Sequence, residues 1–286
     1  MSTSMVKGSP LKLMLRFALP LLIGNLLQQT YNIIDAAIVG QILGASALAS
    51  VGASSSVQFL VLGFCMGSCA GFGVPIAKYF GAGDQKKMRD CVFNGAVLTA
   101  AIAVILTTAC ALLCHFILHI LSVPSDIYEG AYQYLIVIFL GIPFTLMYNY
   151  LSSVLRSVGD SRTPFLFLAF SACLNIILDL FCIAVLHWGC MGAAIATVTA
   201  QAISGILCLV FITKKMPLLH LEQENRKCRG DVEKELLLMG LPTGLQFSIT
   251  AIGSMVMQSA NNGLGSTCVS GFTAGMRIKQ FTMCPF

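Results

Sequence analysis

Long apolar stretches separated by short clusters of charge dominate the pattern of this chain. Between Phe17 and Ala77 the only charged residue is Asp35, and these 61 residues are enough for two crossings of a lipid core about 30 Å thick. Four further stretches carry at most one charge each: residues 91–125, 130–155, 163–213 and 236–276. The pattern predicts an all-α polytopic membrane protein.

Polar and glycine-bearing turns divide these stretches into eight predicted spans. Six form an N-terminal lobe, residues 1–213, with spans at about 13–38, 47–77, 91–117, 131–155, 163–186 and 192–213. Residues 214–239 form a predicted cytoplasmic linker, whose last nine residues resemble an amphipathic helix on the membrane surface. Residues 240–286 begin a second lobe, with helix seven and an incomplete helix eight.

Proline positions predict where helices begin and bend. Pro164 and Pro242 suit the first turns of spans five and seven, where a missing N–H costs little. Pro20 and Pro143 fall inside spans one and four and predict kinks there. A weak internal repeat, Ala-Leu-Pro ending at Pro20 and Gly-Leu-Pro ending at Pro242, is consistent with one six-helix unit followed by the start of a second.

The composition supports the membrane assignment. Residues of the set AVILMFWYC make up 57% of the chain and charged residues 10%, against roughly 25% charged residues in soluble proteins. The mean hydropathy is +0.84. So few polar groups cannot cover a water-facing surface, which excludes a soluble domain, a disordered chain and a nucleic-acid-binding protein.

The basic residues fall on one side of the predicted membrane. Fifteen of the 17 lysines and arginines precede span one or lie between spans two and three, four and five, or six and seven. The loops on the other side, near 40–46, 118–129, 187–191 and 261–265, contain none. The positive-inside rule therefore predicts a cytoplasmic N-terminus. Span one is too long, and too polar at Gln28, Gln29 and Asn32, to be a cleaved signal peptide.

The 12 cysteines do not indicate a disulfide framework. Most lie inside apolar runs, where a thiol behaves as a small hydrophobe: Cys65, Cys69, Cys110, Cys114, Cys173, Cys182 and Cys208. Only His115 and His119, beside Cys114, offer partners for a metal, and they do not close a ligand set. We therefore expect packing roles and no metal site formed by cysteines.

Two carboxylates remain inside predicted spans. Of the 12 acidic residues, only Asp35 and Asp179 do not fall in loops. A charged carboxylate near the middle of a bilayer costs at least about 2.5–3.5 kcal/mol, so it normally faces a cavity, pairs or takes up a proton. The alternative is that each lies near a helix end and reaches water, which suits Asp35 better than Asp179.

Neighbouring polar residues favour a buried site. Asn175 lies four residues before Asp179 and Ser171 four before that, so the three share one face of span five. Span one carries Gln28, Tyr31, Asn32 and Asp35 at helical spacing. Both carboxylates belong to the outer half of the membrane. Two carboxylates that face each other at low dielectric cannot both stay charged, so a proton or a cation is favoured between them, as ion coupling requires.

No motif of conventional enzymes is present: the chain has no P-loop, no GxSxG and no HExxH. Gly81-Ala82-Gly83-Asp84 matches the GxGD string of intramembrane aspartyl proteases, which is the one competing interpretation. Three residues that suit a cytoplasmic hairpin, Gln85-Lys86-Lys87, follow it, so a turn is the better interpretation. We expect that the protein is not an enzyme and needs no cofactor.

Several motifs, in order from about Leu11 to the last residue, resemble those of the MATE family, the multidrug and toxic compound extruders, and most nearly its DinF-like branch. PLLIGNLLQQTYNIIDAAIVGQILGASALASVG resembles the family's first helix and following turn, and LRSVGDSRTP its link between helices four and five. NIILD resembles the Asn-xxx-Asp motif of its fifth helix, GCMGAAIATVTAQ its sixth-helix entry and GFTAGMRIKQF its eighth helix.

This resemblance implies two six-helix lobes with a cavity that opens alternately to either side. It implies export of cationic or amphipathic compounds in exchange for H⁺ or Na⁺, by a monomer in the bacterial cytoplasmic membrane. Asp35, Asn175, Asp179 and Thr197 match the family's coupling site, and Pro20 matches the proline at which its first helix bends. Asn149 is a further residue that could line this lobe.

A family member should have twelve helices, whereas this chain ends inside the eighth, so a truncated product is expected. Three alternatives stay open. One is a lipid-linked saccharide flippase of the same superfamily, which would carry more basic residues in its cavity; spans one to seven have no Lys or Arg in their cores. The others are the intramembrane protease and an inert membrane fragment.

Overall fold

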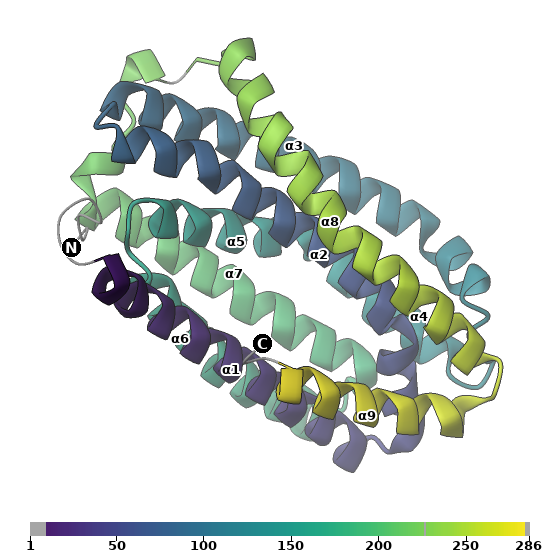
Figure 1. Ribbon diagram of the computed structural model, residues 1–286. Coiled ribbons are helices and arrows are strands. Elements are labelled where there is room, and N and C mark those ends of the chain that lie inside the picture. Colours follow the sequence, from purple (N-terminus) through teal and green to yellow (C-terminus); the bar gives the residue numbers. More distant parts are fainter. Residues whose placement is uncertain (1–9, 226, 284–286) are drawn as a thin grey trace.

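The computed structural model describes residues 10–225 and 227–283, and this part of the chain is helical throughout, with short connections. The prediction of an all-α polytopic membrane protein is confirmed. The elements are α1 (Pro10–Ile42), α2 (Ala45–Gly81), α3 (Gln85–Ile120), α4 (Tyr128–Leu140), α5 (Ile142–Ser157), α6 (Arg162–Leu180), the π-helix η1 (Phe181–Val185), α7 (Gly189–Lys215), the short 3₁₀ helices η2 (Pro217–Leu219) and η3 (Gln223–Asn225), α8 (Gly230–Asn262) and α9 (Ser266–Met283) (Figure 1).

Five of these helical segments are long and apolar enough to cross a membrane: α2, α3, α6 with η1, α7 and α8. The pair α4 and α5 forms a sixth candidate, bent by 49° at Gly141, with Pro143 in the first turn of α5. The predicted bend near Pro143 is therefore present. α1 has 33 residues and continues through Pro20 as one uninterrupted helix.

The GxGD string forms a turn, as predicted. α2 ends at Gly81 and α3 begins at Gln85, and Gly83 has a φ of +76°, which glycine adopts without strain. The Asp84 carboxylate accepts a hydrogen bond from the Lys87 amide at 3.0 Å and so caps α3. Asp84 therefore lies in a turn, where it caps a helix, and not within a membrane helix, where an intramembrane aspartyl protease has its aspartate.

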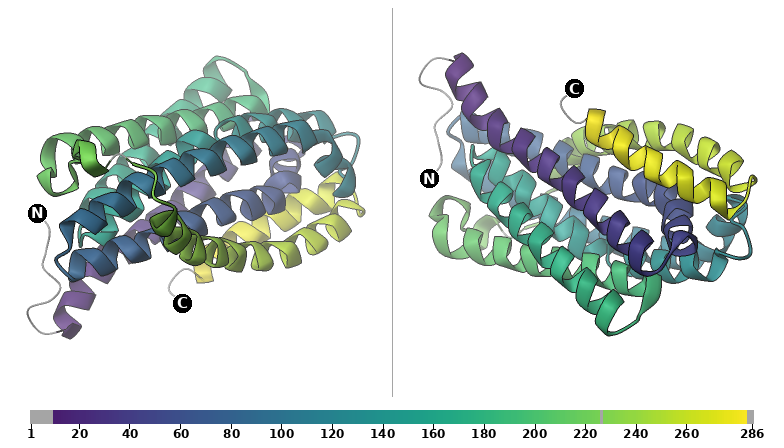
Figure 2. Two further views of the ribbon diagram at one scale, coloured as in Figure 1. Left: turned by 90° about the horizontal axis from the view of Figure 1, so that it is seen from above. Right: turned by 90° about the horizontal axis from the view of Figure 1, so that it is seen from below.

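The central helix is α2, which α8 crosses in close contact, while α1 packs along α6 and meets α9 (Figures 1 and 2). Small residues permit the close approach of α2 and α8. A Cβ atom on Gly71 would lie 2.6 Å from the Gly240 Cα, and one on Gly244 would lie 2.4 Å from the Ser68 hydroxyl. This is the small-residue packing that membrane helices use in place of a hydrophobic driving force.

The structure differs from the sequence-based expectation at the start of α8. Residues 231–239 do not form a separate surface helix but are the first turns of α8, so Pro242 lies inside that helix. The reason is packing against protein: the Leu236 side chain is fully buried, and Glu235 Oε1 pairs with Lys78 Nζ at 2.9 Å. The far end of α8 is also tied, because Asn262 Nδ2 donates to the Leu121 carbonyl at 2.9 Å.

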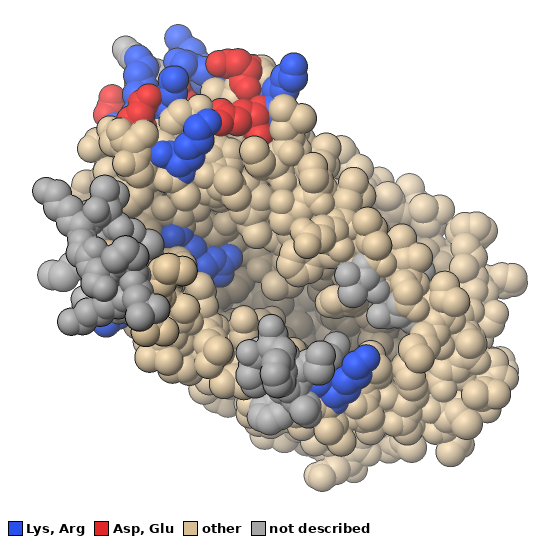
Figure 3. Space-filling model, in the orientation of Figure 1, with Lys and Arg blue, Asp and Glu red and all other residues tan. Residues whose placement is uncertain are grey.

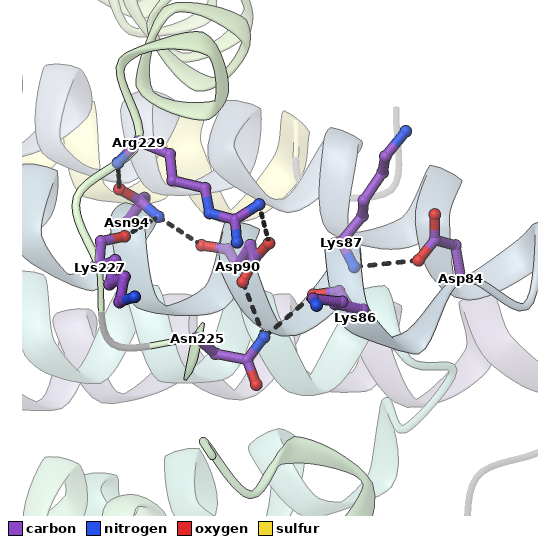
Figure 4. Close-up of polar contacts among 8 residues, drawn as sticks. All are labelled: Asp84, Lys86, Lys87, Asp90, Asn94, Asn225, Lys227 and Arg229. Atoms are coloured by element: carbon purple, nitrogen blue, oxygen red, sulfur yellow. Dashed lines mark hydrogen bonds and ion pairs between the residues drawn. The ribbon is translucent and has the colours of Figure 1, made fainter. Parts of the chain in front are cut away.

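The segment that precedes α8 is clamped to the first turns of α3 (Figure 4). Arg229 Nη1 lies 3.0 Å from Asp90 Oδ2, and Asn225 Nδ2 donates to Asp90 Oδ1 at 2.7 Å. The Asn94 side chain accepts from the Arg229 amide at 2.9 Å and donates to the Lys227 carbonyl at 3.2 Å. This clamp, formed by Asp90, Asn94, Asn225 and Arg229, fixes the linker to the first lobe.

Charged side chains gather at one end of the molecule, over the α2–α3 turn and the linker, and leave most of the visible surface uncharged (Figure 3). The opposite loops contain the exposed residues Ser125 and Asp126. This distribution fits the predicted orientation.

The orientation can be tested with two natural thiols, Cys228 in the linker and Cys268 at the start of α9, both exposed. With the other accessible thiols replaced by serine, a membrane-impermeant maleimide should label Cys268 in intact cells and Cys228 only after the cells are opened. A cysteine introduced at Ser125 should react like Cys268. Labelling of Cys228 from outside would reverse the orientation.

Candidate functional site

A cavity of about 860 Å³ opens between α1, α5, α6 and α7 on one side and α2, α8 and α9 on the other. Figure 3 shows this face hollowed, with a basic side chain inside the hollow. Side-chain amides from six helices line it: Asn25, Gln28, Gln29, Asn32, Gln58, Asn149, Asn175, Gln201 and Gln258. Amides of this kind bind both donors and acceptors without adding charge, so the cavity is polar although it lies within the membrane spans.

The structure brings together the two carboxylates predicted to be in the membrane. Asp35 on α1 lines the cavity and is 8% exposed, and Asp179 on α6 lies behind it and is fully buried. The two carboxyl groups lie within hydrogen-bonding reach of each other. The alternative in which each carboxylate reaches water at a helix end does not fit, because Asp179 is fully buried and Asp35 is only 8% exposed.

Asn175 and Thr197 complete this group. When the Asn175 amide is oriented to satisfy its neighbours, its nitrogen donates to Asp179 Oδ2 at 3.1 Å, and its oxygen accepts from Thr197 Oγ1 at 3.3 Å. Asn175 is 2% exposed, and Ser171, one turn away on the same face of α6, is also buried. Residues from α1, α6 and α7 thus lie together here, and they are the four that the family resemblance implies; we call Asp35, Asn175, Asp179 and Thr197 the carboxylate site.

The backbone changes its helical form immediately after this site. α6 ends at Leu180, one residue past Asp179, and continues as the π-helix of Phe181–Val185. A π-helix shifts the side chains that follow relative to an α-helix and is frequent at functional positions. No sequence signal predicted it.

The carboxylate site can hold one positive charge. Two ionised carboxylates offer only acceptors, so their contact requires a proton or a cation between them. Asp179 Oδ1 is buried and accepts no hydrogen bond from the described residues, so one acceptor is available for such a proton. Within residues 10–225 and 227–283, no three His, Cys, Asp or Glu side chains converge as a metal site.

Most cysteines have the packing role expected of them. Of the seven named from the sequence, six are buried, while Cys173 is exposed on α6. Among the residues that the structure describes, the cysteines are free thiols.

Arg156 was not recognised as a cavity residue from the sequence. The predicted fourth span ends at residue 155 and leaves Arg156 in the cytoplasmic loop that follows, but α5 extends to Ser157, so Arg156 occupies the last turn of that helix. Arg156 lines the cavity, and Lys279 on α9 lines it as well. Cavity-lining basic residues are thus present. Their supposed absence therefore no longer argues against a lipid-linked saccharide as substrate.

Together, the helices and the site define a polytopic all-α membrane protein built around a polar cavity with a buried pair of carboxylates. The MatE family model matches residues 20–181, and the chain therefore belongs to the MatE family. Members of this family are transporters rather than enzymes.

Similar proteins include the "Probable multidrug resistance protein YpnP" of Bacillus subtilis (strain 168), 32% identical over 98% of this chain and 62% of that protein. The "Probable multidrug resistance protein NorM" of Thermotoga maritima is 28% identical over 96% of this chain and 60% of its own length. The chain thus spans about 62% of the relative first described.

Solved structures show the same fold. An outward-facing multidrug resistance MATE family transporter aligns with a TM-score of 0.87 at 24% identity, covering 97% of this chain and 62% of that one. An inward-facing structure of such a transporter aligns with a TM-score of 0.85 at 23% identity, covering 96% and 62%. The chain therefore shares its fold with both structures.

Proposed function

We propose that this chain serves in secondary active efflux of cationic or amphipathic compounds, by ion antiport with alternating access. The observation that carries the proposal is the buried contact of Asp35 with Asp179 on the wall of a cavity of about 860 Å³. A substrate cation in the cavity and a proton at the carboxylate site both neutralise the same negative charge, so each weakens the binding of the other. An antiporter requires this competition, because the binding of the ion must favour release of the substrate.

The coupling ion in this proposal is H⁺ rather than Na⁺. With its amide oriented to satisfy its neighbours, Asn175 directs its nitrogen at Asp179 Oδ2, and a donor in this place repels a metal cation but stabilises a carboxylate. Two carboxyl groups in contact also suit a proton that is held between them.

In this proposal α1 is the helix that moves, and it bends at Pro20. Pro20 lines the cavity on α1, the helix that also carries Asp35, and a proline leaves one backbone carbonyl of its helix without its usual partner. We propose that protonation of the carboxylate site and bending of α1 at Pro20 are linked. The protein then works as a monomer in the bacterial cytoplasmic membrane, with its N-terminus inside.

The test is to bind tetraphenylphosphonium to the purified chain in lipid nanodiscs in weakly buffered solution, with a pH indicator. Binding should release protons, and the affinity for the cation should rise with pH, because the deprotonated site carries the negative charge that attracts it. Adding Na⁺ at constant ionic strength should have little effect. Binding without proton release would contradict the coupling, and displacement of the cation by Na⁺ alone would assign the site to sodium.

A further inference from the structure

The cavity contains a second charged position, far from the carboxylate site. Arg156 is half-buried in the last turn of α5, with its guanidinium near Cys69 of α2, Tyr148 of α5 and Cys208 of α7. It therefore lies among the cytoplasmic halves of three helices. The carboxylate site lies in the opposite half, on the order of 20 Å away at 1.5 Å rise per helical residue.

No carboxylate among the described residues is paired with Arg156. The nearest in sequence, Asp160, is occupied elsewhere: Oδ1 accepts from the amides of Arg162 at 3.1 Å and Thr163 at 3.0 Å, and Oδ2 accepts from the Thr163 hydroxyl at 2.7 Å. Asp160 thus caps α6 and leaves the guanidinium of Arg156 without a counter-ion. A half-buried arginine in this state attracts an anionic group from the cavity.

The other basic residue of the cavity differs in setting. Lys279 lies on α9 and is exposed, so water screens its charge, whereas the guanidinium of Arg156 is partly shielded by the surrounding helices. A guanidinium also presents a planar pair of donors that fits a carboxylate, which an ammonium group does not. The cavity is therefore electrically polar along its length, basic toward the cytoplasm and acidic in the outer half.

We propose that Arg156 forms the subsite for the acid group of an amphipathic substrate, so that this residue decides how tightly the cavity binds compounds that carry a carboxylate beside their cation. The proposal rests on the proposed function, because it assumes that amphipathic compounds enter this cavity. It assigns the residue that distinguishes compounds with an acid group from simple cations. Arg156 is here a specificity-determining residue and has no part in ion coupling.

A matched pair of dyes tests the proposal. Rhodamine 123 is the methyl ester of rhodamine 110, so the two share one xanthene cation and differ in whether a free carboxylate is present. Their affinities for the chain in phosphatidylcholine nanodiscs are measured by fluorescence polarisation. Arg156→Gln should weaken rhodamine 110 about tenfold to a hundredfold, as expected for a charge-assisted pair, and leave rhodamine 123 within about twofold. Arg156→Lys should restore part of the loss, and Arg162→Gln, at an exposed arginine that does not line the cavity, should change neither dye by more than about twofold.

The outcomes separate this proposal from the proposed function. If Arg156→Gln weakens both dyes equally, or neither, the subsite is refuted while a cavity for amphipathic cations stands. If the unaltered chain binds neither dye nor tetraphenylphosphonium, the proposed function itself fails. Proton release on tetraphenylphosphonium binding should be the same in Arg156→Gln and the parent; a loss of release would show that Arg156 acts through the carboxylate site and would overturn its assignment as an acid subsite.

Discussion

Asp179→Asn should abolish proton release when tetraphenylphosphonium binds, from about one proton per bound cation to none, because one carboxyl group of a coupled pair has been removed. Asparagine has the same shape and can still accept from Asn175, so the fold should be retained. The affinity for the cation should also lose its pH dependence. The measurement is the indicator titration described above, with circular dichroism and elution volume as checks on folding.

Asp126→Asn is the matched control, because it removes a carboxylate from an exposed loop and leaves the cavity unchanged. It should release protons like the parent chain. If Asp179→Asn still releases protons at the parent level, Asp179 is not the coupling residue. If Asp126→Asn loses release as well, the signal comes from general surface charge, and the carboxylate site is not its source.

Arg229→Met should free the linker from α3. Asp90 is 1% exposed, so removal of its ion-pair partner leaves a buried carboxylate with fewer compensating contacts. Breaking a buried pair costs up to about 3–5 kcal/mol, and because Arg229 is 38% exposed we expect about 2 kcal/mol here. Hydrogen exchange of the amides of residues 216–229 should then accelerate on the order of thirtyfold.

The control for this experiment is Lys227→Met, since the Lys227 side chain is exposed and only its carbonyl takes part in the clamp. Methionine preserves the apolar length of both side chains, so the comparison isolates the charge. Equal exchange in the two variants would show that the Arg229–Asp90 pair does not hold the linker. Unchanged cation binding in Arg229→Met would be consistent with a role in holding the linker.

The membrane fold and the two carboxylates within it follow from the sequence because the cost of burying charge in lipid is large and has a definite sign, whereas Thr197 was indicated only by the family resemblance. Asp35 and Asp179 stood out among 12 acidic residues for this reason, and Asn175 followed from its helical spacing. The turn at Gly83 was predictable because few residue types adopt a positive φ.

The start of α8, the position of Arg156 and the clamp depend on tertiary contacts, which the spacing of hydrophobic residues along the sequence does not show. The start of α8 could not be inferred, because its first turns are amphipathic in sequence and only the pairing of Glu235 with Lys78 shows that they pack on protein. Arg156 was misassigned because a basic residue at the end of a span fits a loop equally well. The clamp at Asp90 joins residues more than 130 positions apart, since Asn225 is 135 residues away.

The double attachment of α8 limits how this molecule can rearrange. The helix is fastened near one membrane face by Glu235 and near the other by Asn262, about 40 Å apart at 1.5 Å per residue. A helix that is held at both ends cannot tilt until one of the two contacts breaks, and it then rotates about the contact that remains. The two contacts differ in setting: water can replace the exposed Lys78–Glu235 pair, whereas release of the buried Asn262–Leu121 bond leaves two buried polar groups unpaired. α8 therefore has two alternative pivots, one near each membrane face. Which of the two contacts breaks determines which end of the helix moves.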